Sequence, residues 1–128
     1  MGAVGGERLR TGKRGEDAAV AHLTGVGYRI VERNYRCPFG EIDIIARDGE
    51  SLVFVEVKSR RSGRYGGPRL AVGPKKQQKL SLLAQFYLKQ KRLYGCRARF
   101  DVAAVTVMSG GENRVELIKN AFDLCYGW

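Results

Sequence analysis

Residues 40–58 read GEIDIIARDGESLVFVEVK, and this stretch decides the fold. Apolar residues recur at every second position over Gly40–Arg47 and again over Leu52–Lys58, which is the period of a β-strand. The dipeptide Asp48-Gly49 between the two runs is typical of a tight hairpin turn. The stretch therefore predicts an antiparallel β-hairpin.

Two registers of this hairpin satisfy the pattern. If Asp48 and Gly49 alone form the loop, Asp43 faces Phe54 and Glu56 lies on the diagonal; with a four-residue loop, Asp43 faces Glu56 directly. Both registers place the same aliphatic residues on one face: Ile42, Ile44, Val53, Val55 and Val57. Both also gather the same charged residues on the other face: Asp43, Glu56 and Lys58. A slip by one residue would bury these charges among the valines, so the pattern excludes it.

Two carboxylates at either spacing can share one hard divalent cation. Directly opposite Cβ atoms lie ~4.5–5.5 Å apart and diagonal ones ~7–8 Å apart. Lys58 projects to the same side as Glu56, so it can orient a water or stabilise charge on a phosphate. These groups suit metal-assisted phosphodiester hydrolysis with Mg²⁺ or Mn²⁺.

The alternative is a solvated strand face with an incidental ion pair. Three apolar residues share the charged face, namely Ile45, Leu52 and Phe54. They indicate that the turn end of this face is covered, which concentrates the charges at the other end. A half-buried pair of like charges is unfavourable without a counter-ion, which weakens this alternative but leaves both interpretations open.

Helices and strands continue on both sides of the hairpin. The sequence predicts a helix at Gly15–Val26, a strand at Tyr28–Tyr35, a helix at Pro74–Arg92, and strands at Arg99–Val107 and Arg114–Ile118. This order predicts an α/β fold with a mixed sheet flanked by helices. Residues 1–12 are predicted to be a flexible basic arm, and residues 13–128 a single domain.

Composition favours a polyanionic partner. Among 128 residues, Lys and Arg total 23 and Asp and Glu total 13, a formal net charge of +10. Nucleic acid fits this excess first, and an anionic membrane surface second. The cysteines Cys37, Cys96 and Cys125 form no C-x-x-C pair, and no apolar run reaches the ~18 residues of a membrane span. We therefore expect a cytoplasmic protein without a membrane anchor.

The basic residues cluster after the hairpin. Ser59–Pro74 is rich in glycine and arginine, and the next helix begins with Lys75-Lys76-Gln77-Gln78-Lys79. The residues expected to contact nucleic acid are Arg60, Arg61, Arg64, Lys75, Lys76, Gln77 and Lys79. Phosphate contacts of this kind give affinity with little sequence information. The exposed aromatic residues that a base-stacking platform needs are not evident, and Tyr65 is the best candidate in the loop. Recognition of single strands by stacking is therefore disfavoured.

These residues resemble a known superfamily. The signature of PD-(D/E)XK nucleases is an aspartate followed, after a spacer, by E-x-K. It is matched here by Asp43, twelve intervening residues and Glu56-Val57-Lys58. Four longer segments are similar to the bacterial YraN family, which is described as Holliday-junction-resolvase-like: Gly12–Ala19, Gly40–Ala46, Phe54–Arg60 and Arg99–Val102. The resemblance covers about residues 12–107 and implies a restriction-endonuclease-like αβββαβ core.

The resemblance also implies a role for each site residue. Asp43, Glu56 and the main-chain carbonyl of Val57 would hold Mg²⁺ or Mn²⁺. Lys58 would act on the attacking water or the scissile phosphate, and Glu16 would be an additional acidic residue of the site. The proline in the superfamily's name is replaced here by Ile42.

The function expected from this resemblance is a metal-dependent DNA endonuclease that prefers structure, such as junctions or flaps, over base sequence. The alternatives are a nucleic-acid-binding module that does not cut and a basic protein-interaction domain. No small-molecule cofactor is expected. Cutting a junction symmetrically predicts a homodimer, for which the C-terminal residues Phe122, Leu124, Tyr126 and Trp128 offer a surface.

Two further acidic residues have weaker indications. Glu41 shares the strand of Asp43 and is expected at the surface or beside the site. Asp101 lies between Phe100 and Val102, where a buried structural role is favoured over a remote place in the site.

Overall fold

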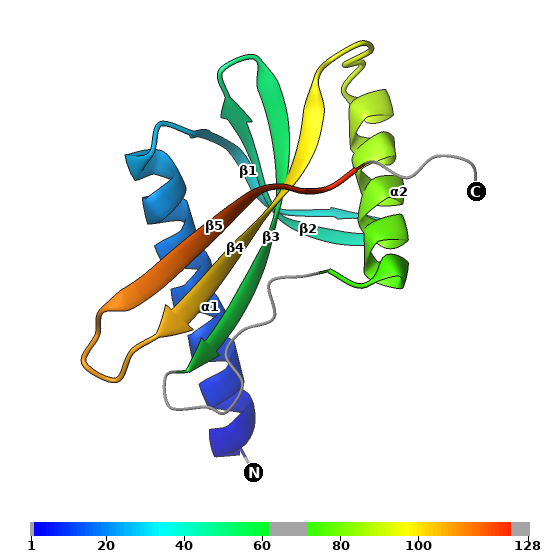
Figure 1. Ribbon diagram of the computed structural model, residues 1–128. Coiled ribbons are helices and arrows are strands. Elements are labelled where there is room, and N and C mark those ends of the chain that lie inside the picture. Colours follow the sequence, from blue (N-terminus) through cyan, green and yellow to red (C-terminus); the bar gives the residue numbers. More distant parts are fainter. Residues whose placement is uncertain (1, 62–71, 124–128) are drawn as a thin grey trace.

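The part of the chain that the structure describes forms one five-stranded sheet with two helices. The structure is a computed structural model that describes residues 2–61 and 72–123, with side chains from residue 12 onward. Its elements in chain order are α1 (Gly2–Gly25), β1 (Arg29–Cys37), β2 (Gly40–Asp48), β3 (Ser51–Arg61), α2 (Pro74–Gln90), β4 (Ala98–Val107) and β5 (Asn113–Phe122). The predicted order of helices and strands is confirmed (Figure 1).

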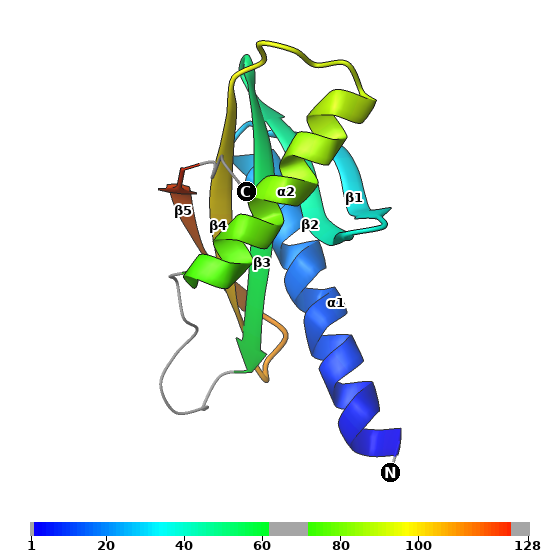
Figure 2. The ribbon, with the colours of Figure 1, turned by 90° about the vertical axis from the view of Figure 1, so that its right-hand side faces the viewer.

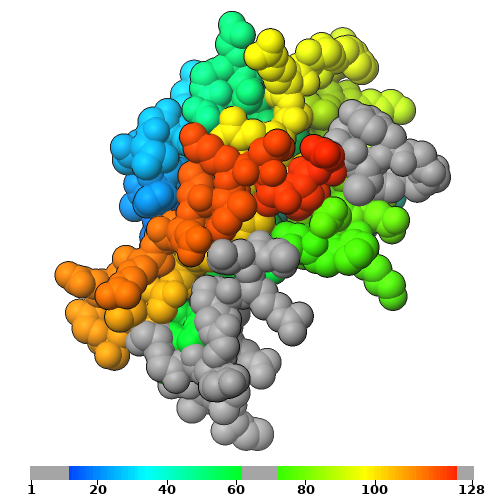
Figure 3. Space-filling model, viewed as in Figure 1, coloured from blue at the N-terminus to red at the C-terminus, as the bar shows by residue number. Residues whose placement is uncertain are grey.

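The sheet is mixed. Its strand order is β1-β2-β3-β4-β5, with β3 and β4 parallel and every other neighbouring pair antiparallel. Parallel neighbours need a crossover, and α2 provides it. In the space-filling view, β5 runs in orange and red across one face of the molecule, and its red end lies beside the green residues of α2 (Figure 3).

A hydrophobic core lies on each face of the sheet. On one face Leu80, Leu83 and Tyr87 of α2 pack on Phe54 and Phe100 of the sheet. On the other face, apolar residues of α1 pack on the second set of strand side chains, among them Ala19, Leu23, Val53, Val55 and Val105. Figure 2 shows α2 in front of the sheet and α1 behind it. The apolar turn end of the hairpin's charged face is therefore covered by α2, as predicted.

The hairpin adopts the second of the two predicted registers. Ile44 pairs with Val55 and Asp48 pairs with Ser51, so paired residue numbers sum to 99. The turn itself contains only two residues, Gly49 and Glu50, with Gly49 in the left-handed region at φ 60°. The pairing ends at Ile44 and Val55, one residue short of Asp43 and Glu56.

One predicted face assignment is wrong. Ile42 packs in the α2 core with Ile45, whereas Ile44 packs in the α1 core. Strict alternation therefore holds only from Ile44 onward. Across the sheet, Arg33 pairs with Ile44 and Tyr35 with Ile42, so Asn34 lies opposite the interruption. Asn34 has left-handed backbone at φ 53°, which disturbs the pleat at this point.

The first helix also differs from the prediction. It begins at Gly2 rather than Gly15, so the residues expected to form a flexible arm continue the helix. Their glycines lower intrinsic helix propensity and concealed this continuation in the sequence. Figure 2 shows these first turns extending beyond the sheet. No helix among the described residues is long and apolar enough to span a membrane.

Candidate metal and nucleic-acid site

Asp43 of β2 and Glu56 of β3 meet where the hairpin strands diverge. Both residues are partly buried, and the Glu56 side chain is 15% exposed. The main-chain N–H of Val57 donates a 2.8 Å hydrogen bond to Oδ2 of Asp43. The Glu56 carboxyl is close enough for its negative charge to raise the pKa of Asp43. The structure thus brings together the acidic pair that the sequence predicted.

The environment of this pair favours a cation. Burial, together with the neighbouring negative charges of Glu56 and Glu16, raises the pKa of Asp43 to about 7, although the Val57 N–H lowers it. A divalent cation would relieve both the desolvation and the repulsion, and it would displace the proton that the pair otherwise retains. The donors are carboxylate oxygens, as Mg²⁺ and Mn²⁺ prefer. These residues therefore fit such an ion.

Glu16 reaches this region because α1 packs unusually close to β3. A Cβ atom added at Gly15 would lie 1.8 Å from Oγ of Ser59 and 2.7 Å from its Cβ, so only glycine permits the approach. The adjacent Glu16 side chain is 16% exposed, and its negative charge contributes to the raised pKa of Asp43. Within the described residues, no three acidic, histidine or cysteine side chains converge tightly enough to form a ready metal cluster. Glu16 is therefore an outer member of this acidic group.

A lysine from the second helix already neutralises part of the site. Nζ of Lys76 lies 3.5 Å from Oε2 of Glu56, and the Lys76 side chain is half exposed. Lys58 is half-buried on β3, two residues from Glu56. Cationic groups from β3 and from the start of α2 therefore lie beside the acidic pair.

The remaining basic residues have different surroundings. Lys75 and Lys79 are exposed on the first turns of α2, and Arg60 and Arg61 end β3. Gln77 is occupied locally, since its side-chain amide donates a 2.7 Å hydrogen bond to the carbonyl of Val72. The predicted contact Arg64 and the loop aromatic Tyr65 lie outside the described residues, as do three of the four C-terminal dimer candidates: Leu124, Tyr126 and Trp128.

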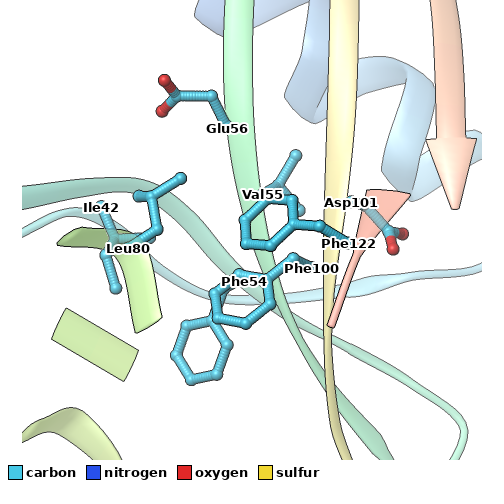
Figure 4. A pocket seen from close by; sticks show the side chains of 8 residues that line it. All are labelled: Ile42, Phe54, Val55, Glu56, Leu80, Phe100, Asp101 and Phe122. Carbon is cyan, nitrogen blue, oxygen red and sulfur yellow. The ribbon is translucent and has the colours of Figure 1, made fainter. Parts of the chain in front are cut away.

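The two weaker acidic candidates lie apart from the pair. Glu41 forms an exposed ion pair with Arg36 at 3.1 Å. Asp101 is fully buried and bonded to Tyr28, Arg99 and the main chain of Asn120, so the favoured structural role is confirmed. Figure 4 shows a small apolar pocket between β3, β4 and α2, with the Glu56 and Asp101 carboxylates directed to opposite sides of it.

Sequence reasoning missed two residues of β1. Nε and Nη2 of Arg33 donate to Oε1 of Glu16 at 2.9 and 2.7 Å. Nδ2 of Asn34 donates to the same oxygen at 3.1 Å. The ease with which asparagine adopts left-handed backbone is the one signal in the sequence that could have pointed to Asn34. Nothing local in the sequence linked Arg33 to Glu16.

The mixed sheet between two helices defines an α/β protein with a restriction-endonuclease-like core. More specifically, the chain belongs to the family described as Uncharacterised protein family UPF0102, the YraN family, which matches residues 15–105.

Relatives that carry the same family name extend over nearly the whole chain. A UPF0102 protein of Syntrophus aciditrophicus is 62% identical over 94% of each chain. One of Geobacter sulfurreducens is 53% identical over 90% of each chain, and one of Trichlorobacter lovleyi is 46% identical over 98% of this chain and all of its own. The names of these relatives give a family and no activity.

Proposed function

We propose that this protein is a metal-dependent DNA endonuclease that selects its substrate by structure rather than by base sequence. One observation carries the proposal. The partly buried pair Asp43 and Glu56 lies across the central hairpin, with Lys58 two residues along the same strand. A surface ion pair would not concentrate like charges away from water in this way.

Asp43, Glu56 and the main-chain carbonyl of Val57 would hold Mg²⁺ or Mn²⁺. The bound ion would supply Lewis-acid activation of water and stabilise charge on the phosphate. The chain's own contribution is to fix the acidic pair, which the Val57 N–H does through Oδ2 of Asp43. Lys58 would then orient the attacking water or stabilise the scissile phosphate.

The basic residues near the pair would bind the DNA backbone. Lys75, Lys76 and Lys79 of α2, together with Arg60 and Arg61 of β3, provide charge without a base-reading pattern. Arg64 of the intervening segment joins this proposed set, and Gln77 would contribute through the second N–H of its side-chain amide, because only one is donated to Val72. Such contacts give salt-dependent affinity for branched or flap DNA of any sequence. A two-fold homodimer would allow symmetric cleavage of a junction.

A second candidate function is nucleic-acid binding without cleavage. The described residues form no three-ligand metal cluster, and Lys76 already neutralises Glu56. In that case the same basic residues would bind DNA, and Asp43 and Glu56 would be remnants of a site.

Cleavage of labelled DNA separates the two candidates. Four-way junction, flap, single-strand and duplex substrates are incubated with Mg²⁺, Mn²⁺ or EDTA, using wild type and the variants Asp43→Asn, Glu56→Gln and Lys58→Ala. We expect metal-dependent products that fall at least about 100-fold in each variant. Glu41→Gln is the matched control, because Glu41 lies on the same strand but pairs only with exposed Arg36 among the described residues.

Products that persist in Asp43→Asn would come from a contaminant or another site and would contradict the proposal. Salt-dependent binding without products under any metal would favour the non-catalytic module.

A further inference from the structure

We infer that Arg33 and Asn34 of β1 are positioning residues, which fix the Glu16 carboxylate beside the acidic pair so that it strengthens divalent-cation binding. This inference rests on the proposed metal site and identifies how its outer acidic member is held.

Three donors converge on a single oxygen of Glu16. Nε and Nη2 of Arg33 and Nδ2 of Asn34 all bond to Oε1, at 2.9, 2.7 and 3.1 Å. Among the described residues, no hydrogen bond reaches Oε2. A carboxylate held at one oxygen has a fixed orientation, and its other oxygen is available to a further partner.

The backbone of β1 is shaped for this contact. Asn34 adopts left-handed backbone at φ 53° within a strand, where extended backbone is the rule. The flanking pairs Arg33–Ile44 and Tyr35–Ile42 place Asn34 opposite Asp43. The irregular residue therefore connects Glu16 on one element with the site on another.

The helix is fixed at the same point from the other side. Gly15 is buried against Ser59 of β3, so α1 cannot move toward or away from the sheet without losing this fit. Arg33 also pairs with Asp17 at 2.7 Å, but the Asp17 side chain is 52% exposed. The Glu16 side chain is only 16% exposed, so Glu16 is the more buried of the two carboxylates that pair with Arg33.

Electrostatics alone predicts the opposite effect on cation binding, which makes the inference testable. Removing the positive charge of Arg33 should by itself tighten the binding of a nearby cation, since like charges repel. A positioning role instead predicts weaker binding, because Glu16 is no longer held. Partners that orient the groups of a metal site are typically worth about 10–100-fold in affinity.

The test measures Mn²⁺ affinity by calorimetry and electron paramagnetic resonance, without DNA. We expect Arg33→Gln and Glu16→Gln each to weaken Mn²⁺ binding about tenfold, and the double variant to bind no more weakly than either. Asp17→Asn is the matched control and should bind as wild type does. If Arg33→Gln does not fold, Asn34→Gly keeps the left-handed backbone, removes one donor, and should weaken binding by a smaller factor of about three.

Tighter or unchanged Mn²⁺ binding in Arg33→Gln would overturn the inference. The inference would also fall if Arg33→Gln weakened Mn²⁺ binding by the same factor in the wild type and in the Glu16→Gln variant. Asp43→Asn distinguishes this failure from failure of the proposed function. If Asp43→Asn abolishes binding while Glu16→Gln does not change it, the metal site stands and the positioning role falls. If Asp43→Asn binds like wild type, or wild type does not bind Mn²⁺, both fall.

Discussion

Two aspartates on neighbouring parts of the sheet have opposite environments. Asp101 is fully buried, and it accepts hydrogen bonds from Tyr28 at 2.7 Å, from Arg99 at 3.0 Å and from the main chain of Asn120 at 3.0 Å. Asp43 is only partly buried, and it accepts one main-chain hydrogen bond while lying against another carboxyl group. The more deeply buried acid is therefore the better satisfied one.

The difference separates a structural acid from a candidate functional one. Arg99 also pairs with Asp48 at 2.7 Å, and Lys119 lies 3.8 Å from Asp48, so two cations balance the two carboxylates within the fold. Burial and the hydrogen bond to Asp101 raise the pKa of Tyr28, which keeps its hydroxyl as a donor. Among the described residues, the Val57 N–H is the one hydrogen-bond donor to Asp43, so a cation from solution would complete its environment.

The largest expected effect is that of Asp101→Ala. The substitution leaves Arg99 and the hydroxyl of Tyr28 without their buried acceptor, and we expect a loss of about 3–5 kcal/mol in the free energy of unfolding. Chemical denaturation monitored by circular dichroism measures this. A loss below about 1 kcal/mol would mean that Asp101 does not organise the network.

Tyr28→Phe removes only one donor of that network. We expect a loss of about 1.5–3 kcal/mol, because the missing hydrogen bond joins a neutral hydroxyl to a buried carboxylate. The same denaturation experiment applies, with the double variant Tyr28→Phe/Asp101→Ala as its control. Additive losses in the double variant would contradict a direct coupling.

Asp43→Asn should raise the free energy of unfolding, whereas the two preceding substitutions lower it. The raised pKa of about 7 means that the folded state retains a proton that the unfolded state loses near 3.8, so ionisation of Asp43 destabilises the fold as pH rises between these values. We expect the variant to be more stable than wild type by about 1–2 kcal/mol at pH 8. This gain should vanish below about pH 3, where Asp43 is protonated in both states. A gain that does not depend on pH would contradict the assignment.

The smallest effect is expected for Asp48→Asn. A hydrogen bond from Arg99 lowers the pKa of Asp48, so its stabilising contribution is present above 3.8 and is lost as pH falls through the lower value. The side chain is 32% exposed, which limits the loss at pH 7 to about 0.5 kcal/mol. Thermal unfolding at pH 7 and pH 2.5 measures the difference. A loss at pH 7 as large as that of Tyr28→Phe would make Asp48 a full member of the buried network.

Much of the fold could be predicted because its signals are local. Period-two alternation located β2 and β3, and the helical spacing of Leu80, Leu83 and Tyr87 located α2. The predicted face of Ile42 was wrong because the irregular backbone that displaces this residue belongs to Asn34 on another strand. The start of α1 was missed because its glycines lack the apolar pattern on which a helix prediction depends.

The sequence by itself determined the hairpin, the nearness of Asp43 and Glu56, and the basic charge that follows them. Only the tertiary structure decided between the two registers, bonded Arg33 to Glu16 across 17 residues of chain, and gave Asp101 its donors. The physical reason is that alternation and charge act between near neighbours, whereas the environment of a carboxylate depends on the donors that distant elements bring to it.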